Sequence, residues 1–175
     1  LGTLPPFNAQ HTMGSMGASV GVLHGMGLSG LPEPAVCTIG DGTFFHAGVA
    51  PLLNMVHNKG KGTVIIMDNR TTAMTGHQDN PASGETLMGE PATQVSIEGV
   101  LSACGYQNII IVDPQDLKAM EQAVKDALAS QVPAAIITRR PFLLIKKINP
   151  EIGKCQVGSE VCRSCKMCLK VGCPA

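Results

Sequence analysis

The stretch that decides the fold is Ala35-Val36-Cys37-Thr38-Ile39-Gly40-Asp41-Gly42-Thr43, in which an apolar run ends abruptly in Gly-Asp-Gly. Residues 35–39 predict a strand without polar alternation, which is typical of a parallel sheet covered on both faces. Similar runs predict three more strands, and the segments between them repeat apolar residues at helical spacing. The pattern predicts an α/β fold with a mainly parallel sheet and crossover helices. The expected strands are 35–39, 63–67, 108–112 and 134–138, and the expected crossover helices are 49–56 and 117–128.

Three segments outside this alternation carry weaker patterns. Residues 11–28 predict a helix so rich in Gly, Ala and Ser that another helix or a ligand should pack closely against it. A shorter helix is expected over residues 95–103. Residues 69–93 show no periodicity and contain several Gly and Pro residues, so this long loop is expected to be either functional or disordered.

Polar residues follow two of the expected strands, in Gly40-Asp41-Gly42-Thr43 and in Asp68-Asn69-Arg70-Thr71. In open α/β sheets, ligands bind outside the carboxyl ends of the strands. A Gly-Asp-Gly turn lets main-chain amides approach a phosphate, and the oxygens of Asp41 and Asn69 suit Mg²⁺. Gly-Asp-Gly alone is a common turn, but its pairing with Asn69 predicts a site for a diphosphate cofactor and Mg²⁺.

The charge divides the chain into two parts. The formal net charge is zero overall, but it is −6 over residues 1–138 and +6 over residues 139–175. We therefore expect a main domain over residues 1–145 and a small segment over residues 146–175. No apolar run approaches the roughly 18 residues that would span a bilayer, so a transmembrane protein is excluded, and no nucleic-acid partner is expected. The chain starts at Leu1 and stops just after a cysteine motif, which predicts a piece of a longer protein.

Five of the seven cysteines crowd into the last 21 residues. No signal peptide precedes them, so a reducing compartment, the cytoplasm, and a metal site are favoured over disulfides. The spacing Cys162-x-x-Cys165-x-x-Cys168-x-x-x-x-Cys173-Pro174 is close to that of bacterial ferredoxins, which bind 4Fe-4S clusters. Zinc is the weaker alternative, because zinc sites usually pair two separate Cys-x-x-Cys units. Cys37, Cys104 and Cys155 fall outside this motif.

These motifs together resemble the thiamine-diphosphate-binding domain of the 2-oxoacid:ferredoxin oxidoreductase family. The similarity is greatest to the large subunits of its indolepyruvate group, and it covers essentially the whole chain. The segments that carry it are Leu4-Pro5-Pro6-Phe7-Asn8-Ala9, Met16-Gly17-Ala18-Ser19, Gly40-Asp41-Gly42-Thr43-Phe44-Phe45-His46-Ala47-Gly48 and Asp68-Asn69-Arg70-Thr71-Thr72-Ala73-Met74-Thr75-Gly76-His77-Gln78.

The resemblance implies a role for each matching residue. The side chains of Asp41 and Asn69 and the main-chain carbonyl of Thr71 would bind Mg²⁺, and Met16 would support the bent cofactor, with plain core packing as its alternative. His46 and His77 are candidates for substrate binding or proton transfer, with a surface or helix-start role as the alternative. The residues around the diphosphate would be Gly40, Gly42 and Thr43.

The same resemblance implies the function of the whole protein. Cys162, Cys165 and Cys168 would hold one 4Fe-4S cluster and Cys173 a second, and the enzyme would convert an aryl 2-oxoacid such as indolepyruvate to its acyl-CoA and reduce ferredoxin. A smaller second subunit and a homodimer are also implied. The chain alone is expected to be inactive, because the glutamate that activates the cofactor belongs to another domain. Two alternatives are an iron-sulfur electron-transfer module with a scaffolding α/β domain and a non-oxidative thiamine-dependent decarboxylase or synthase.

Overall fold

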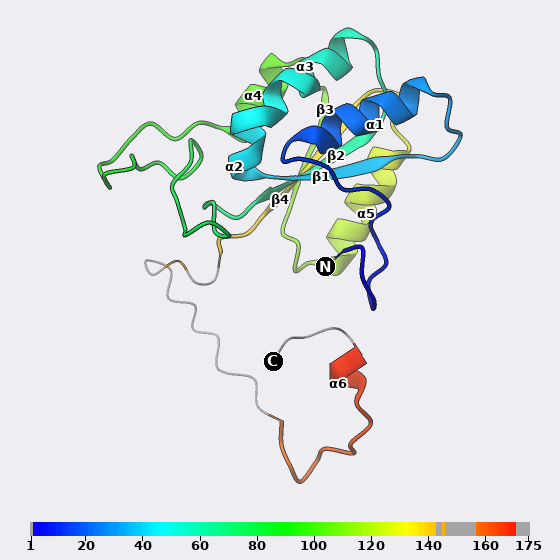
Figure 1. Cartoon of the computed structure of the whole chain (residues 1–175), viewed down its shortest axis with the longest axis vertical. Coiled ribbons are helices and arrows are strands. Elements are labelled where there is room, and N and C mark those ends of the chain that lie inside the picture. Colours follow the sequence, from blue (N-terminus) through cyan, green and yellow to red (C-terminus); the bar gives the residue numbers. More distant parts are fainter. Residues whose placement is uncertain (1, 143–144, 146–156, 171–175) are drawn as a thin grey trace. The chain divides into compact units, whose positions relative to one another are not determined.

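The computed structural model describes residues 2–142, 145 and 157–170. Contacts divide the chain into two units, which we describe separately: Ser15–Asn149 is one, and Leu1–Gly14 with Pro150–Ala175 is the other. The larger unit holds four strands and most of the helices (Figure 1). The strands are β1 Val36–Gly40, β2 Thr63–Asp68, β3 Asn108–Val112 and β4 Ala134–Arg139; the helices are α1 Ala18–Leu28, α2 Asp41–Thr43, the π-helix η1 Phe44–Gly48, α3 Val49–His57, α4 Ile97–Ala103 and α5 Leu117–Leu128.

The four strands form one fully parallel sheet in the order β1-β2-β4-β3. This confirms the predicted fold class and places each expected strand within one residue at either end. The centre of the sheet carries the most buried side chains, among them Ile66, Ile136 and Ile137, which explains why their strands lack polar alternation. All four carboxyl ends lie at the same edge of the sheet, because the strands are parallel.

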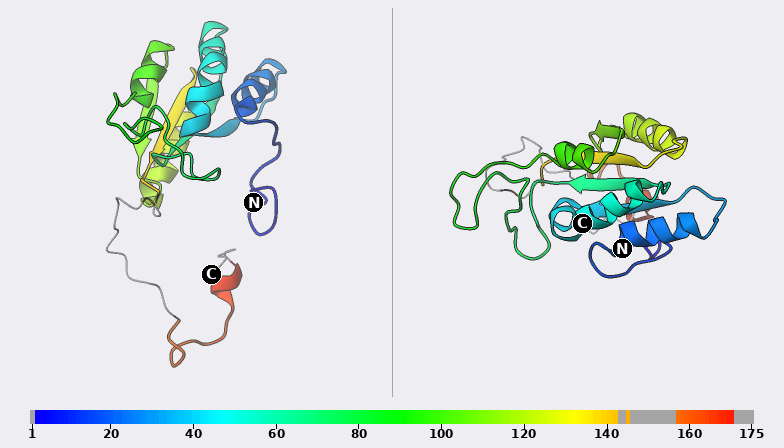
Figure 2. Two further views of the ribbon diagram at one scale, coloured as in Figure 1. Left: turned by 60° about the vertical axis from the view of Figure 1, so that its left-hand side comes forward. Right: turned by 90° about the horizontal axis from the view of Figure 1, so that it is seen from above.

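The helices cover both faces of the sheet (Figure 2). The chain passes from β1 to β2 in one direction along the sheet and from β3 to β4 in the other, so right-handed crossovers place α3 and α5 on opposite faces. The larger core includes Leu23, Leu52 and Leu101 from α1, α3 and α4. The smaller core on the other face includes Ala123 and Ala127 from α5.

The helix predicted over residues 11–28 begins only at Ala18, so that prediction was wrong in its first seven residues. Gly17 has a φ of +87°, in the left-handed region that favours glycine. A side chain at this position would also collide with the Cβ of Ala47 in η1. The close approach expected for this small-residue segment is therefore made between Gly17 and η1.

The Gly-Asp-Gly segment is the start of a helical segment rather than a tight turn. Gly40 ends β1 in extended conformation, Asp41 opens α2, and η1 and α3 follow without a break. π-Helical turns are rare and occur often at functional sites. The free main-chain N–H groups of a helix start serve the same purpose that was expected of the turn.

The long loop between β2 and α4 is organised by main-chain hydrogen bonds. Thr72 and Gln78 form an antiparallel bridge with two N–H···O contacts of 2.9 and 3.2 Å. A second antiparallel bridge joins Glu85 and Pro91. The loop ends at Ser96, whose hydroxyl accepts a hydrogen bond from the Gly99 N–H and caps α4.

In the smaller unit, residues 157–170 contain one short helix, α6 Met167–Lys170. The Cys168 side chain, Cys155 and Cys173 lie outside the described residues. Across the part of the chain that the structure describes, the helices are all too short or too polar to cross a membrane.

Candidate active site

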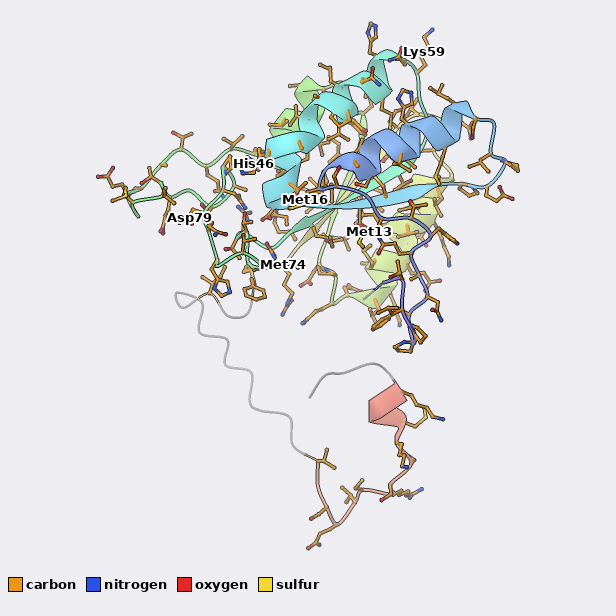
Figure 3. All side chains as sticks on the ribbon, in the orientation of Figure 1. Met13, Met16, His46, Lys59, Met74 and Asp79 are labelled. Atoms are coloured by element: carbon orange, nitrogen blue, oxygen red, sulfur yellow. The ribbon has the colours of Figure 1, made fainter. Side chains whose placement is uncertain are left out.

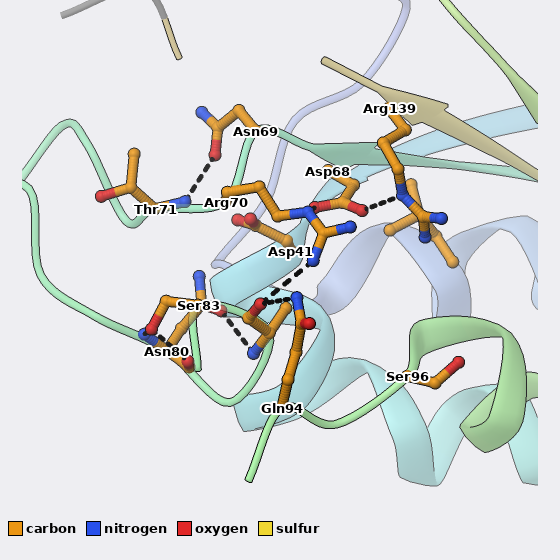
Figure 4. A network of polar contacts seen from close by, with 12 residues as sticks. Asp41, Asp68, Asn69, Arg70, Thr71, Asn80, Ser83, Gln94, Ser96 and Arg139 are labelled. Atoms are coloured by element: carbon orange, nitrogen blue, oxygen red, sulfur yellow. Dashed lines mark hydrogen bonds and ion pairs between the residues drawn. The ribbon is translucent and has the colours of Figure 1, made fainter. Parts of the chain in front are cut away.

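Asp41, Asn69 and Thr71 come together at the carboxyl edge of the sheet (Figure 4). Asp41 follows β1, and Asn69 and Thr71 follow β2, which pairs directly with β1. The strand pairing therefore brings together residues that are 28 positions apart in sequence. The structure places these three predicted ligands at one edge, as the sequence motif requires.

The Asp41 carboxylate is only 3% exposed. Its Oδ1 atom accepts a hydrogen bond from the Gly42 N–H at 2.7 Å, whereas Oδ2 is buried without a hydrogen-bond partner among the described residues. Burial raises the pKa of Asp41 above its ordinary 3.8; the Gly42 N–H acts against this, and the negative charge of Asp68 adds to it. A buried carboxylate oxygen without a proton donor is suited to a cation.

Asn69 and Thr71 are tied to each other and to the rest of the loop. The Asn69 Oδ1 atom accepts a hydrogen bond from the Thr71 N–H at 3.2 Å, which leaves its second lone pair for another partner. Thr71 is buried, and its hydroxyl donates to the Gln78 carbonyl at 3.3 Å. The Phe142 N–H donates to the Asn69 carbonyl at 3.0 Å, so the chain beyond β4 also fixes Asn69.

A charged cluster below these residues was not predicted from the sequence. Asp68 is 1% exposed, and its carboxylate faces two arginines: Arg139 Nε lies 2.7 Å from Oδ2 and Arg70 Nε lies 3.4 Å from Oδ1. Arg139 also contacts Glu98 at 2.6 Å. The strand-end position of Asp68, directly before Asn69, was the available signal, but its partners are distant in sequence.

The three other predicted side chains lie on the surface (Figure 3). Met16 is 75% exposed, so core packing does not explain it, and it directly precedes Gly17, which packs on η1. His46 is exposed on η1. His77 is also exposed and stacks on the Phe142 ring with a centroid distance of 5.4 Å.

The residues at this edge fit a hydrated divalent cation. Mg²⁺ prefers oxygen ligands and retains several waters, so one carboxylate and one or two neutral oxygens suffice when a diphosphate supplies others. The orphaned Oδ2 of Asp41 and the second lone pair of Asn69 meet this requirement. No group of three or more His, Cys, Asp or Glu residues able to hold a metal occurs among the described residues, and the set found here does not depend on one.

Comparison with protein families decides what this edge belongs to. The family model described as "Thiamine pyrophosphate enzyme, C-terminal TPP binding domain" matches residues 3–138, where thiamine pyrophosphate is another name for thiamine diphosphate. The chain belongs to this family. The parallel sheet, the polar carboxyl edge and the family match agree with one another and confirm the resemblance found in the sequence.

The thiamine pyrophosphate domain is similar over its whole length to curated large subunits. It is 37% identical to indolepyruvate oxidoreductase subunit IorA of Pyrococcus horikoshii and 39% identical to that of Methanothermobacter marburgensis, each over 100% of this chain. The subunit of Archaeoglobus fulgidus is 36% identical over 91% of it. The chain spans 26–30% of the length of these relatives.

Solved structures of thiamine enzymes share the fold. A 2-oxoglutarate:ferredoxin oxidoreductase from Magnetococcus marinus matches with a TM-score of 0.62 and 21% identity, over 70% of this chain and 44% of that one. A thiamine diphosphate-dependent 4-hydroxybenzoylformate decarboxylase from Rhodococcus jostii matches with a TM-score of 0.52 and 21% identity, over 73% and 23% of the two chains. At these identities the likeness shows the fold alone.

The isolated cysteines of the thiamine pyrophosphate domain differ from those of the tail. Cys37 and Cys104 are buried, and burial raises the pKa of Cys37 to about 12, so its sulfur stays a thiol. Cys162 and Cys165 are exposed and not in disulfides. Ser164 and Lys166 beside them have φ values of 49° and 58°, so the chain bends sharply between the exposed thiols and α6.

Proposed function

We propose that this chain is the cofactor-binding part of an oxidoreductase that oxidatively decarboxylates an aryl 2-oxoacid such as indolepyruvate. The products would be the acyl-CoA, carbon dioxide and reduced ferredoxin. The unpartnered, buried Oδ2 of Asp41 beside Asn69 carries the proposal for this domain. The similarity to IorA subunits supports the 2-oxoacid and ferredoxin chemistry, and their names support indolepyruvate as substrate.

The chain's own residues would bind and orient the cofactor. Thiamine diphosphate, when bound, supplies a carbon nucleophile and an electron sink. Asp41, Asn69 and the Thr71 carbonyl would hold Mg²⁺ against its diphosphate, and the main chain of Gly40, Gly42 and Thr43 at the helix start would face the phosphate oxygens.

Exposed side chains around this edge would complete the site. Met16 would support the bent cofactor, and its exposure leaves it free to do so. His46 and His77 are positioned on the surface to meet a substrate carboxylate, and the Phe142 ring holds His77. Coenzyme A, ferredoxin, a smaller subunit and a second copy of the enzyme are the proposed partners. The 175-residue chain alone should be inactive, because it spans about three tenths of its relatives.

Calorimetric titration with thiamine diphosphate, with and without Mg²⁺, tests this proposal. We expect the wild-type chain to bind only with Mg²⁺, and Asn69→Ala to weaken this binding about tenfold or more, a loss of about 1.4 kcal/mol. The variant loses a cation ligand and the hydrogen bond to the Thr71 N–H. Asn58→Ala, an exposed asparagine at the end of α3, is the control and should bind as wild type does.

Two results would contradict the proposal. One is binding of thiamine diphosphate to the wild-type chain that is equally strong without Mg²⁺. The other is a folded wild-type chain that binds none, which would favour the alternative of an electron-transfer module whose α/β domain is only a scaffold.

For the tail, we propose a 4Fe-4S cluster on Cys162, Cys165 and Cys168, with Cys173 as a ligand of a second cluster. The exposed, unpaired thiols of Cys162 and Cys165 support it, because thiolates are the ligands of such clusters. We expect anaerobic reconstitution with iron and sulfide to give bound iron and a low-temperature EPR signal on reduction, and Cys165→Ser to lose both. Cys37→Ser is the control and should retain them, because Cys37 is buried in β1. Equal iron in the two variants, or tighter binding of zinc than of a cluster, would contradict this assignment.

A further inference from the structure

Arg139 contacts residues at both ends of the loop that carries Asn69 and Thr71. Its Nε lies 2.7 Å from Oδ2 of Asp68, which directly precedes the loop, and its Nη1 lies 2.6 Å from Oε1 of Glu98, in the first turn of α4 after the loop (Figure 4). A guanidinium group is planar and presents donors in fixed directions, so one side chain can hold two carboxylates in place.

These contacts are short, charged and shielded from water. Asp68 is almost fully buried, and the side chains of Arg139 and Glu98 are 28% and 29% exposed. The hydrogen bond from Arg139 holds the pKa of Glu98 down to about 2. The second oxygen of Glu98 accepts from the Ser96 hydroxyl at 2.9 Å, and that hydroxyl caps α4. The contact with Arg139 therefore extends into the hydrogen bonds that start α4.

We propose that Arg139 is a positioning residue for the cation site, which keeps Asn69 and Thr71 in place by holding Asp68 and Glu98. The inference rests on the proposed function, since it concerns how that site is held in shape. Arg139 itself does not touch the cation or the cofactor. Without it, the loop would keep its own hydrogen bonds but lose the contact that fixes its two ends relative to each other.

The next residue along the chain provides a matched control. Arg140 also makes a 2.6 Å ion pair, but its partner is Asp113, which follows β3 and is not part of the loop. Arg140→Gln therefore removes the same charge and one ion pair at a neighbouring position. A comparison of Arg139→Gln with Arg140→Gln separates the hold on the loop from the loss of a positive charge.

Two measurements on the whole chain test the proposal. The first is amide hydrogen exchange without ligand, followed at the loop amides of Thr72, Gln78 and Ala92, which donate hydrogen bonds within the loop. The second is titration with thiamine diphosphate in the presence of Mg²⁺. We expect Arg139→Gln to speed loop exchange and weaken binding, each about tenfold or more, which corresponds to about 1.4 kcal/mol. Exchange in β2 and α5 should not change, and Arg140→Gln should behave as wild type.

The conservative variant adds a graded result. Lysine keeps the charge of Arg139 but lacks the fork that reaches two carboxylates, so Arg139→Lys should fall between wild type and Arg139→Gln in both measurements. It also serves as the test variant if Arg139→Gln does not fold.

The outcomes separate this inference from the proposed function. Unchanged loop exchange in the Arg139 variants overturns the positioning role, whether or not the cofactor binds. Equal effects of the Arg139 and Arg140 variants overturn it too, as does faster loop exchange with unchanged cofactor binding. A wild-type chain that binds no thiamine diphosphate contradicts the proposed function, while the exchange data still decide whether Arg139 holds the loop.

Discussion

Asp41→Asn should abolish Mg²⁺-dependent binding of thiamine diphosphate and, at the same time, make the ligand-free chain more stable near neutral pH. The wild-type carboxylate is buried, and one of its oxygens has no hydrogen-bond partner in the described structure. An ionised group in this position is costly unless a cation is bound. Asparagine has the same shape without the charge, so we expect the free energy of unfolding to rise by roughly 0.5–2 kcal/mol, as in other exchanges of activity for stability.

The effect of Asp41→Asn should depend on pH. Because burial raises the pKa of Asp41 in the folded chain, the folded state binds this proton more readily than the unfolded state does. The contribution of Asp41 to the free energy of unfolding is therefore fully present below the ordinary pKa of 3.8 and is lost as the pH rises through the raised pKa of the folded chain. The advantage of the variant should appear above that range and shrink towards acid pH.

Urea unfolding at several pH values, together with calorimetric titration, checks this prediction. Asp79→Asn is the control, because Asp79 is an exposed carboxylate of the same loop, and it should leave both stability and binding unchanged (Figure 3). A variant Asp41→Asn that is less stable than wild type at neutral pH, or that still binds the cofactor with Mg²⁺, would show that Asp41 is not a strained cation ligand.

Phe44→Ala should cost the domain about 3–5 kcal/mol of unfolding free energy, the range found when a large core aromatic is removed. Phe44 is fully buried at the start of η1, directly after α2, and packs in the larger core. Since domains of this kind are stable by only about 5–15 kcal/mol, the loss is a large part of the total. The unfolding midpoint in urea, followed by circular dichroism, measures it.

Phe45→Ala is a matched control for this prediction. The two rings contact each other edge to face at a centroid distance of 4.9 Å, so either substitution removes the same aromatic pair. Phe45 is only partly buried, and its loss should therefore cost clearly less. Equal costs, or a greater cost for Phe45→Ala, would mean that burial in the core does not decide the stability of this helical segment.

The sheet and the two crossover helices could be predicted from the sequence because burial leaves a local pattern. Strand β3 and helix α5 have the predicted ends, and the other strands differ by one residue at most. The start of α1 was misplaced because residues 11–17 share the composition of the helix that follows. Only the conformation of Gly17, packed against Ala47, shows that the helix cannot begin earlier.

The sequence by itself determined the fold class, the family and the pair Asp41 and Asn69, since these depend on short motifs and regular spacing. Only the tertiary structure decided which charges lie beneath them. Arg139 is 71 residues from Asp68, yet the two meet because β4 pairs with β2 in the register Asp68↔Arg139. Local patterns of burial do not specify strand order, so a contact that depends on the order β1-β2-β4-β3 becomes visible only once the sheet is assembled.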